Sequence, residues 1–209
     1  MARRKGICVM VDNTFGMGGY LFRPFEWGAH VSVHSATKWI GGHGTALGGV
    51  VVDGGNFDWT PEKYPLLACP SESYHGLVYK DVFGPAAFAG RVRVDGLRNI
   101  GPAPSPFNSF LMLQGLETLS LRAERSCENT LAVAEFLENH PAVESVNYPG
   151  LKSNPYHELG RKYLQHGFGG VLTFRVKGGF KAAAELVGRL ELILHVGSVG
   201  DSKSLIVHP

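Results

Sequence analysis

Long runs of one charge are absent from this chain, and their absence limits the partners it can bind. The 20 Lys and Arg residues and the 18 Asp and Glu residues leave a formal net charge of +2, and the basic residues are scattered along the sequence. Proteins that bind a nucleic acid backbone usually present a continuous basic surface. We therefore expect no nucleic acid partner.

Cysteine is also scarce. The chain has three cysteines, Cys8, Cys69 and Cys127, which lie far apart and form no Cys-x-x-Cys pair. This spacing argues against a disulfide framework and against a zinc knuckle, and it favours a reducing compartment. We expect a cytoplasmic protein whose thiols are free and buried.

Long apolar runs are missing as well, because no stretch approaches the length that spans a membrane. The opening residues, MARRKGICVMVD, imitate a signal peptide. Their apolar run covers only Ile7 to Val11, ends at Asp12, and is followed by no small-residue cleavage site. We interpret this run as a strand, and we expect no membrane partner.

Short apolar segments that end in polar residues dominate the first part of the chain. The segment ICVMVDNTF is continuous and rich in β-branched residues, so it predicts a buried parallel strand with Asp12 and Asn13 at its carboxyl end. AHVSVHS and GVVVDGG predict two further strands, separated by the glycine-rich GGHGTALGG. Strands at this spacing indicate part of an α/β sheet, where ligands gather at the carboxyl ends of strands.

The rest of the chain changes character twice. Residues 56–101 are rich in Pro, Tyr and Gly without a clear period, which predicts an irregular segment that is functional or covered by a partner. Helical composition begins at Phe107 and continues until Pro141. Strands are then expected in VESVNYPG, GVLTFRV and KSLIVHP, and helices in PYHELGRKYLQHG and FKAAAELVGRLELI. This part predicts a small α+β domain.

The segment HSATKWIGGHG places Lys38 between hydroxyl residues and a glycine cluster. A lysine at a strand end in a partly desolvated site can act as a Schiff-base nucleophile, although a surface lysine is the simpler alternative. Ser35 and Thr37 offer hydroxyl donors for a phosphate, and Asp12 on the preceding strand offers a carboxylate. Pyridoxal phosphate (PLP) needs a lysine for its aldehyde, an acid for its ring nitrogen and donors for its phosphate. The pattern therefore favours a PLP site.

Other interpretations of the glycines and histidines fail on spacing. GGHGTALGG contains neither G-x-G-x-x-G nor a P-loop pattern, so nucleotide binding is not supported. His30, His34 and His43 have no acidic or cysteine partner at a familiar metal-ligand spacing, so we expect no metal and interpret them as packing or supporting residues. Asp53 and Asp58 lie in turn-forming sequence, where capping or exposure is the default.

The segment VDNTF followed by SATKWIGGHG resembles the Cys/Met-metabolism family of PLP-dependent enzymes. The resemblance continues through SPFNSFLMLQGLETLSLRAERSCEN, HPAVESVNYPGL, GGVLTFRVKGG and VGDSKSLIVHP, and so covers essentially the whole chain. It is strongest to the O-acetylhomoserine sulfhydrylase branch, which carries a segment like SYHGLVYKDVFG after the lysine.

The resemblance implies roles for individual residues. Lys38 would form the Schiff base with PLP, Asp12 would pair with the pyridinium nitrogen, and the hydroxyls of Ser35 and Thr37 would contact the phosphate. Ser198, in HVGSVGDSKSL, falls near the position from which the family touches the substrate carboxylate, where sulfhydrylases often carry Asn.

The resemblance also implies an architecture. We expect residues 1–105 to be part of a large PLP-binding domain of the aminotransferase-like fold type I, and residues 106–209 to be a small C-terminal α+β domain, incomplete at its end. In the family, the phosphate loop and the aromatic residue stacked on the ring lie upstream, and the carboxylate-binding arginine lies beyond Pro209. A central-to-C-terminal fragment is therefore implied, together with a homo-oligomer, a dimer or tetramer, for the full-length form.

The implied reaction is a γ-replacement in sulfur amino-acid biosynthesis. O-acetyl-L-homoserine and sulfide, or a thiol, would give homocysteine, or methionine, and acetate. One alternative is a γ-lyase or γ-synthase of the same family that acts on cystathionine or methionine, although SYHGLVY favours the sulfhydrylase. Another is a catalytically silent fragment that associates with a full-length homologue.

Overall fold

The computed structural model describes residues 1–208, which form two compact units. The first unit comprises Met1–Asn13, Arg23–His34 and Gly49–Pro106. The second unit comprises Thr14–Phe22, Ser35–Gly48 and the residues from Phe107 onward. The predicted division into residues 1–105 and 106–209 concerns the domains of a complete enzyme and stays a prediction.

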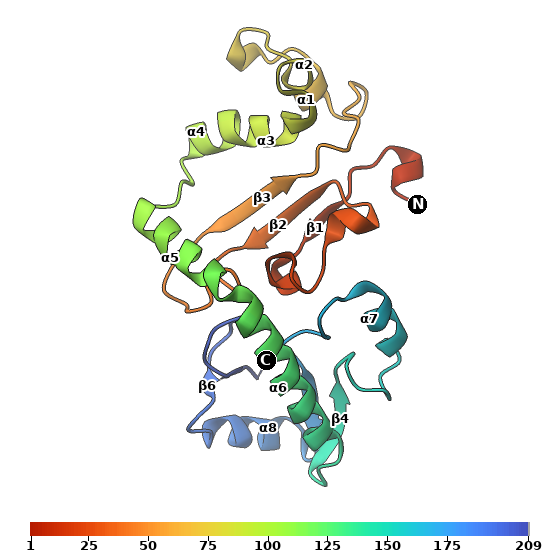
Figure 1. The fold of residues 1–209 in the computed structure, drawn as a ribbon, viewed down its shortest axis with the longest axis vertical. Helices are drawn as coiled ribbons and strands as arrows, with labels where there is room; N and C mark the ends of the chain where they lie inside the picture. Colours follow the sequence, from red (N-terminus) through yellow and green to blue (C-terminus); the bar gives the residue numbers. More distant parts are fainter. Residues whose placement is uncertain (209) are drawn as a thin grey trace. The chain divides into compact units, whose positions relative to one another are not determined.

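A three-stranded sheet forms the centre of the first unit, in the order β1 (Met10–Asp12), β2 (Val31–Ser35) and β3 (Gly49–Asp53) (Figure 1). All three strands confirm the predictions, and β1 and β2 are parallel with Asp12 opposite Val33. Burial was predicted wrongly for β1, because Met10 is 52% exposed. Within residues 1–208, β1 is an edge strand that pairs with β2 alone.

Residues 56–101 are largely helical, so the prediction of an irregular segment was wrong. They contain α1 (Pro65–Ala68), α2 (Tyr79–Phe83), α3 (Ala87–Arg91), a π-helical turn (Val92–Leu97) and α4 (Arg98–Ile100). Short 3₁₀ helices lie at Arg3–Lys5, Thr14–Gly19, Pro24–Trp27, Glu72–Tyr74 and Gly84–Ala86. α1 and α2 are too short to show a hydrophobic period. α3, the π-helical turn and α4 instead follow one another without a break from Ala87 to Ile100, where Gly90 and Gly96 weaken the helical composition. Their shared core consists of Trp59, Leu67, Tyr79 and Ala87.

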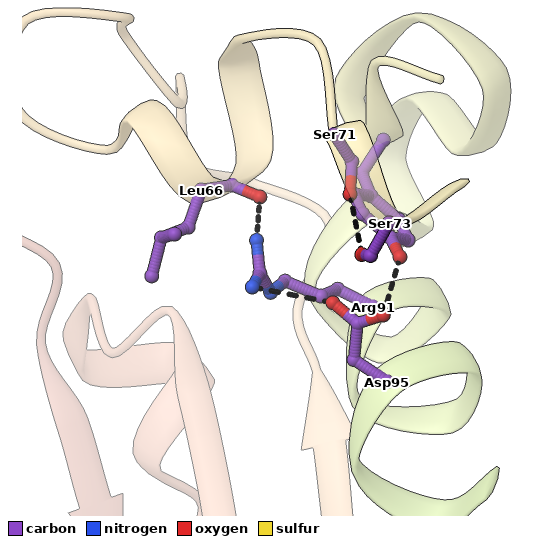
Figure 2. Close-up of polar contacts among 6 residues, drawn as sticks. Leu66, Ser71, Ser73, Arg91 and Asp95 are labelled. Atoms are coloured by element: carbon purple, nitrogen blue, oxygen red, sulfur yellow. Dashed lines mark hydrogen bonds and ion pairs between the residues drawn. The ribbon is translucent and has the colours of Figure 1, made fainter. Parts of the chain in front are cut away.

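A polar network ties these short helices together (Figure 2). The fully buried Tyr79 donates its hydroxyl hydrogen to Asp95 Oδ1 at 2.9 Å. Asp95 also pairs with Arg91 Nη2 at 3.2 Å, and the Arg91 guanidinium donates to the Leu66 carbonyl. α1, α2 and the π-helical turn are therefore joined through one carboxylate and one guanidinium.

The second unit is built from helices and two small sheets, which confirms the predicted α+β character. Its helices are α5 (Pro106–Glu117), α6 (Leu119–Glu138), α7 (His157–Tyr163) and α8 (Gly179–Gly188). β4 (Val143–Asn147) pairs antiparallel with β5 (Thr173–Val176), and β6 (Leu194–His195) pairs parallel with β7 (Leu205–Ile206). α6 packs on β4, and α8 packs on β5.

Two buried clusters stabilise the second unit. The first surrounds Trp39, and its members are Met17, Leu21, Trp39, Leu119, Ala123 and Cys127. The second consists of Ala134, Tyr148 and Leu151, with the Tyr148 hydroxyl donating to the Gly169 carbonyl at 2.8 Å. Trp39 directly follows Lys38, so the first cluster anchors the segment that carries the lysine.

The three cysteines are free, as predicted, but only Cys127 is buried. Cys8 and Cys69 are half-buried. No helix within residues 1–208 is both long enough and apolar enough to cross a bilayer.

Candidate active site

Lys38 lies in a turn directly after β2, and hydrogen bonds fix its main chain on both sides. The Lys38 N–H donates to the Ser35 carbonyl at 3.1 Å, and the Lys38 carbonyl accepts from Gly42 N–H at 2.8 Å. Gly41 N–H donates to the Ala36 carbonyl at 2.8 Å. The side chain of Lys38 is half-buried. The backbone thus leaves the lysine little freedom at the point where its side chain begins.

The amine of Lys38 meets Ser198 across 160 residues of sequence, with Nζ donating to Ser198 Oγ at 2.8 Å. Both residues belong to the second unit. A hydroxyl acceptor at this distance gives a lysine amine one preferred direction. The sequence suggested a substrate contact for Ser198 and did not predict that it meets Lys38.

The hydroxyls of Ser35 and Thr37, the two predicted phosphate donors, differ in their hydrogen bonds within the protein. The Thr37 hydroxyl accepts from Gly48 N–H at 3.1 Å and donates to the Gly48 carbonyl at 3.3 Å, so Gly48 engages it. The Ser35 N–H donates to Thr14 Oγ1 at 2.8 Å. Among residues 1–208, the Ser35 hydroxyl itself has no hydrogen-bond partner, so it can meet a ligand.

Asp12 ends β1 in the first unit, and its carboxylate is exposed. The following residue, Asn13, is buried, and its N–H donates to the Val33 carbonyl of β2 at 2.8 Å. Of the predicted site residues, the structure thus brings Lys38 and Ser198 together, places Ser35 and Thr37 on the same segment, and describes Asp12 in the other unit. A held amine and an open hydroxyl fit the aldehyde and the phosphate of PLP.

The three histidines have roles in packing and in hydrogen bonding. His30 is 2% exposed, and its Nδ1 accepts a main-chain N–H at 2.9 Å. His34 Nε2 lies 3.0 Å from Ser32 Oγ; burial lowers the pKa of His34, and the Asp12 carboxylate opposes that shift. His43 Nδ1 lies 2.7 Å from a main-chain carbonyl. Over residues 1–208, no group of three or more His, Cys, Asp or Glu side chains could hold a metal ion.

The two aspartates in turn-forming sequence behave as predicted. Asp53 Oδ1 accepts the Gly55 N–H at 3.0 Å, which caps the turn after β3. Asp58 is exposed and pairs with Lys80 at 2.6 Å.

The sequence interpretation missed Arg122. Its guanidinium reaches the Trp39 carbonyl, one residue after Lys38, at 3.0 Å. The only local signal is the four-residue spacing of Thr118 and Arg122, whose side chains meet at 3.1 Å. Nothing in the sequence indicates that the arginine reaches a segment 83 residues away.

Comparison with known proteins covers the whole chain. The profile of the Cys/Met metabolism PLP-dependent enzyme family matches residues 1–209. O-acetyl-L-homoserine sulfhydrylase 1 of Thermus thermophilus is 53% identical over 208 residues, which is 100% of this chain and 49% of that protein. Homocysteine/cysteine synthase of Kluyveromyces lactis is 52% identical over 221 residues, again 100% of this chain and 50% of that protein.

A solved structure agrees with these relatives. A Campylobacter jejuni protein described as an O-acetylhomoserine (thiol)-lyase superposes with a TM-score of 0.93 at 39% identity, covering 100% of this chain and 51% of that one. That structure carries an N′-pyridoxyl-lysine-5′-monophosphate. The chain therefore spans about half the length of the relatives that it matches.

Proposed function

The chain belongs to the Cys/Met-metabolism family of PLP-dependent enzymes, and we propose that it carries the cofactor lysine of an O-acetylhomoserine sulfhydrylase. The proposed reaction converts O-acetyl-L-homoserine and sulfide, or a thiol, into homocysteine, or methionine, and acetate. The C–O bond to the acetyl group breaks at the γ-carbon, and a C–S bond forms there. The observation that supports this role most directly is the Lys38 amine, which is held on Ser198 in the turn after β2.

Four residues would hold PLP. Lys38 would bind its aldehyde, Ser35 would donate to its phosphate, and Asp12 would pair with the ring nitrogen. Thr37 would reach the phosphate only by giving up part of its contact with Gly48. PLP, when bound, accommodates the negative charge that develops at the α-carbon of the substrate.

The chain's own residues would move protons, because the acetate on the γ-carbon can leave only after a proton has been removed from the β-carbon as well as from the α-carbon. The Lys38 amine would take the α-proton of the substrate as a general base, which requires the amine to lie within hydrogen-bond reach of that proton. Ser198 Oγ, 2.8 Å from Nζ, would hold the amine in that direction. Ser198 is thereby proposed to act on Lys38, in addition to its suggested contact with the substrate carboxylate.

The cellular location and the oligomeric state are part of the same proposal. Free cysteines and the reaction type are consistent with a cytoplasmic enzyme of sulfur amino-acid metabolism. A homo-oligomer is proposed for the full-length form.

A second candidate function is association with a full-length homologue without catalysis. The observation that favours it is the exposure of four large apolar side chains on α5: Phe107, Phe110, Leu113 and Leu116. Their exposed fractions are 67%, 54%, 60% and 44%, and at a spacing of three residues they wind around the helix.

A product assay separates the two candidates. The test uses the 209-residue chain and a chimera in which this chain replaces the matching half of the Thermus thermophilus relative, so that the residues before and after it are supplied. Each would be given PLP with O-acetylhomoserine and sulfide, or PLP with cystathionine. Homocysteine from the chimera, and little or none from the chain alone, is the expected result. A chimera that cleaves cystathionine but makes no homocysteine would replace the sulfhydrylase with a γ-lyase. A folded chimera that turns over neither substrate would favour the association role.

A further inference from the structure

Arg122 of α6 directs all the hydrogen bonds of its guanidinium at neutral oxygen atoms. Nη1 donates to the Trp39 carbonyl at 3.0 Å, Nη2 donates to the Gly115 carbonyl at 2.7 Å, and Nε donates to Thr118 Oγ1 at 3.1 Å. No carboxylate among residues 1–208 pairs with it, and burial lowers the pKa of Arg122. A partly desolvated cation without a counterion is costly, so its carbonyl partners must hold it in place.

The three acceptors link two parts of the second unit. Gly115 lies in the last turn of α5, and Thr118 lies at the break between α5 and α6. Carbonyls in the last turn of a helix favour a nearby cation. The Trp39 carbonyl belongs instead to the turn that carries Lys38. Arg122 therefore joins the α5–α6 junction to that turn.

Other parts of the second unit pack closely against this turn. A Cβ atom on Gly115 would lie 2.3 Å from the Ile40 carbonyl oxygen, and one on Gly42 would lie 2.4 Å from Arg122 Cζ. Gly42 also has a φ of +72°, in the left-handed region that favours glycine. The guanidinium and the α5 backbone thus lie directly against residues 40–42.

The segment after Ser198 closes on the same turn. Ser202 N–H donates to the Gly42 carbonyl at 2.9 Å, and a Cβ atom on Gly200 would lie 2.7 Å from the Trp39 main-chain nitrogen. Both partners of the contact between Lys38 and Ser198 are therefore attached to residues 39–42, which Arg122 fixes.

We propose that Arg122 is a positioning residue for Lys38, because it fixes the turn at residues 39–42 from which the Lys38 amine is aimed at Ser198. Arg122 does not touch the amine and acts through the Trp39 carbonyl. The proposal rests on the function proposed for Lys38, but the local order that it describes exists without the cofactor. A purely structural role would instead stabilise the whole second unit and leave the amine of Lys38 unaffected.

The test compares three variants of the 209-residue chain by amide hydrogen exchange and by lysine acylation. Arg122→Met removes all three donors, and Arg122→Lys keeps the charge but offers only one donor atom. Arg125→Met is the matched control, because Arg125 lies on the same helix, is 74% exposed and pairs only with Glu128 at 3.5 Å. Acylation of Lys38 is measured relative to the exposed Lys152 in the same sample, which corrects for reagent and global effects.

In Arg122→Met, we expect the amides of Gly41, Gly42 and Ser202 to exchange about tenfold faster or more, since hydrogen bonds to a charged group are among the stronger ones. Lys38 should become more reactive than in the parent chain, while the amides of β4 and β5 keep their rates. Arg122→Lys should give a smaller change in the same amides, and Arg125→Met should give none. If Arg122→Met does not fold, the comparison of Arg122→Lys with Arg125→Met decides.

Two results would overturn the proposal. The first is that amide exchange and the reactivity of Lys38 are unchanged in both Arg122 variants, and the second is that amide exchange becomes uniformly faster over the whole second unit. A parallel sample with PLP and borohydride separates this proposal from the proposed function. Failure of the parent chain to trap PLP on Lys38 would count against the cofactor role, and the exchange result would still decide the role of Arg122.

Discussion

Arg91 in the first unit and Arg122 in the second are both half-buried arginines that donate to main-chain carbonyls, but they differ in what neutralises them. Arg91 pairs with Asp95 four residues away, stacks over the Tyr79 ring at 5.4 Å and donates to the Leu66 carbonyl. Within the described part of the chain, Arg122 has carbonyl and hydroxyl partners only, one of them 83 residues away.

The difference indicates what each network does. The ion pair between Arg91 and Asp95 lies within one group of short helices (Figure 2). Asp95 also accepts the hydroxyl of the buried Tyr79, so the polar groups of this network satisfy one another locally and hold that group together. An arginine without a counterion depends on carbonyls from separate segments, so it holds those segments in register. Among residues 1–208, the hydrogen bonds described around Arg91 reach no predicted site residue. Arg122, in contrast, donates to the carbonyl of Trp39, the residue that follows Lys38.

The largest effect is expected from the predicted site residue of the first unit. Asp12→Asn, made in the chimera in which this chain replaces the matching half of the Thermus thermophilus relative, should leave PLP bound but slow α-proton removal by orders of magnitude. The ring nitrogen would lose the carboxylate that keeps it protonated. The measurement is the exchange rate of the substrate α-proton in D₂O, and a near-normal rate would mean that Asp12 only caps local structure.

A pair of glycines tests how tightly each unit is packed. Gly115→Ala should lower the free energy of unfolding by about 3 kcal/mol, because the new methyl group would meet the carbonyl oxygens of Ile40 and Gly41 at 2.3 and 2.4 Å. Gly96→Ala, in the π-helical turn of the first unit, has nothing within 4 Å and should be neutral or raise stability by about 0.5 kcal/mol. Urea titrations compare the two, and equal losses would contradict the close approach of α5 to the Lys38 turn.

Two buried tyrosines, Tyr79 and Tyr148, donate hydrogen bonds to a charged and to a neutral acceptor, so removing each hydroxyl compares the two kinds of hydrogen bond. Tyr79→Phe should cost about 2 kcal/mol, because its hydroxyl donates to the Asp95 carboxylate. Tyr148→Phe should cost about 1 kcal/mol, because its acceptor is the neutral Gly169 carbonyl. Thermal unfolding of both variants checks the order, and the reverse order would show that Asp95 is fully satisfied by Arg91 alone.

For Tyr79 and Tyr148 we also expect a smaller effect, a loss of folding stability at alkaline pH. Burial raises the pKa of both Tyr79 and Tyr148 above the ordinary value of 10.0. The unfolded chain then loses these protons at a lower pH than the folded chain, so the stability they contribute is complete below pH 10 and is lost as pH rises further. Tyr148→Phe should flatten the fall in stability above pH 10 in urea titrations, and an unchanged slope would contradict its burial.

The sequence predicted the parts of the fold whose signal is local. β1, β2 and β3 follow short apolar runs, and the helix after Phe107 follows composition and ends before Pro141. Residues 56–101 were predicted wrongly because α1 and α2 are too short to carry a period, and because Gly90 and Gly96 weaken the helical composition of the continuous run Ala87–Ile100. Contacts such as that between Tyr79 and Asp95 fix these helices instead.

The candidate site likewise has features that local sequence predicts and features that it does not. Lys38, Ser35 and Thr37 are recognisable because they are adjacent in the chain and their chemistry suits one ligand. The meeting of Lys38 with Ser198 joins residues 160 apart, and the reach of Arg122 to Trp39 joins residues 83 apart. Contacts of that range depend on how the second unit packs, and no local pattern encodes them.

The most direct test of the central claim is to map where PLP becomes attached after borohydride reduction of the 209-residue chain. The chain would be incubated with PLP, reduced, digested and analysed by peptide mass, with Lys38→Ala as the paired variant. We expect one dominant pyridoxyl-lysine at Lys38, which Lys38→Ala eliminates without loss of the folded state by circular dichroism. Attachment spread over surface lysines such as Lys63 and Lys80, at equal levels in the parent chain and in Lys38→Ala, would contradict it.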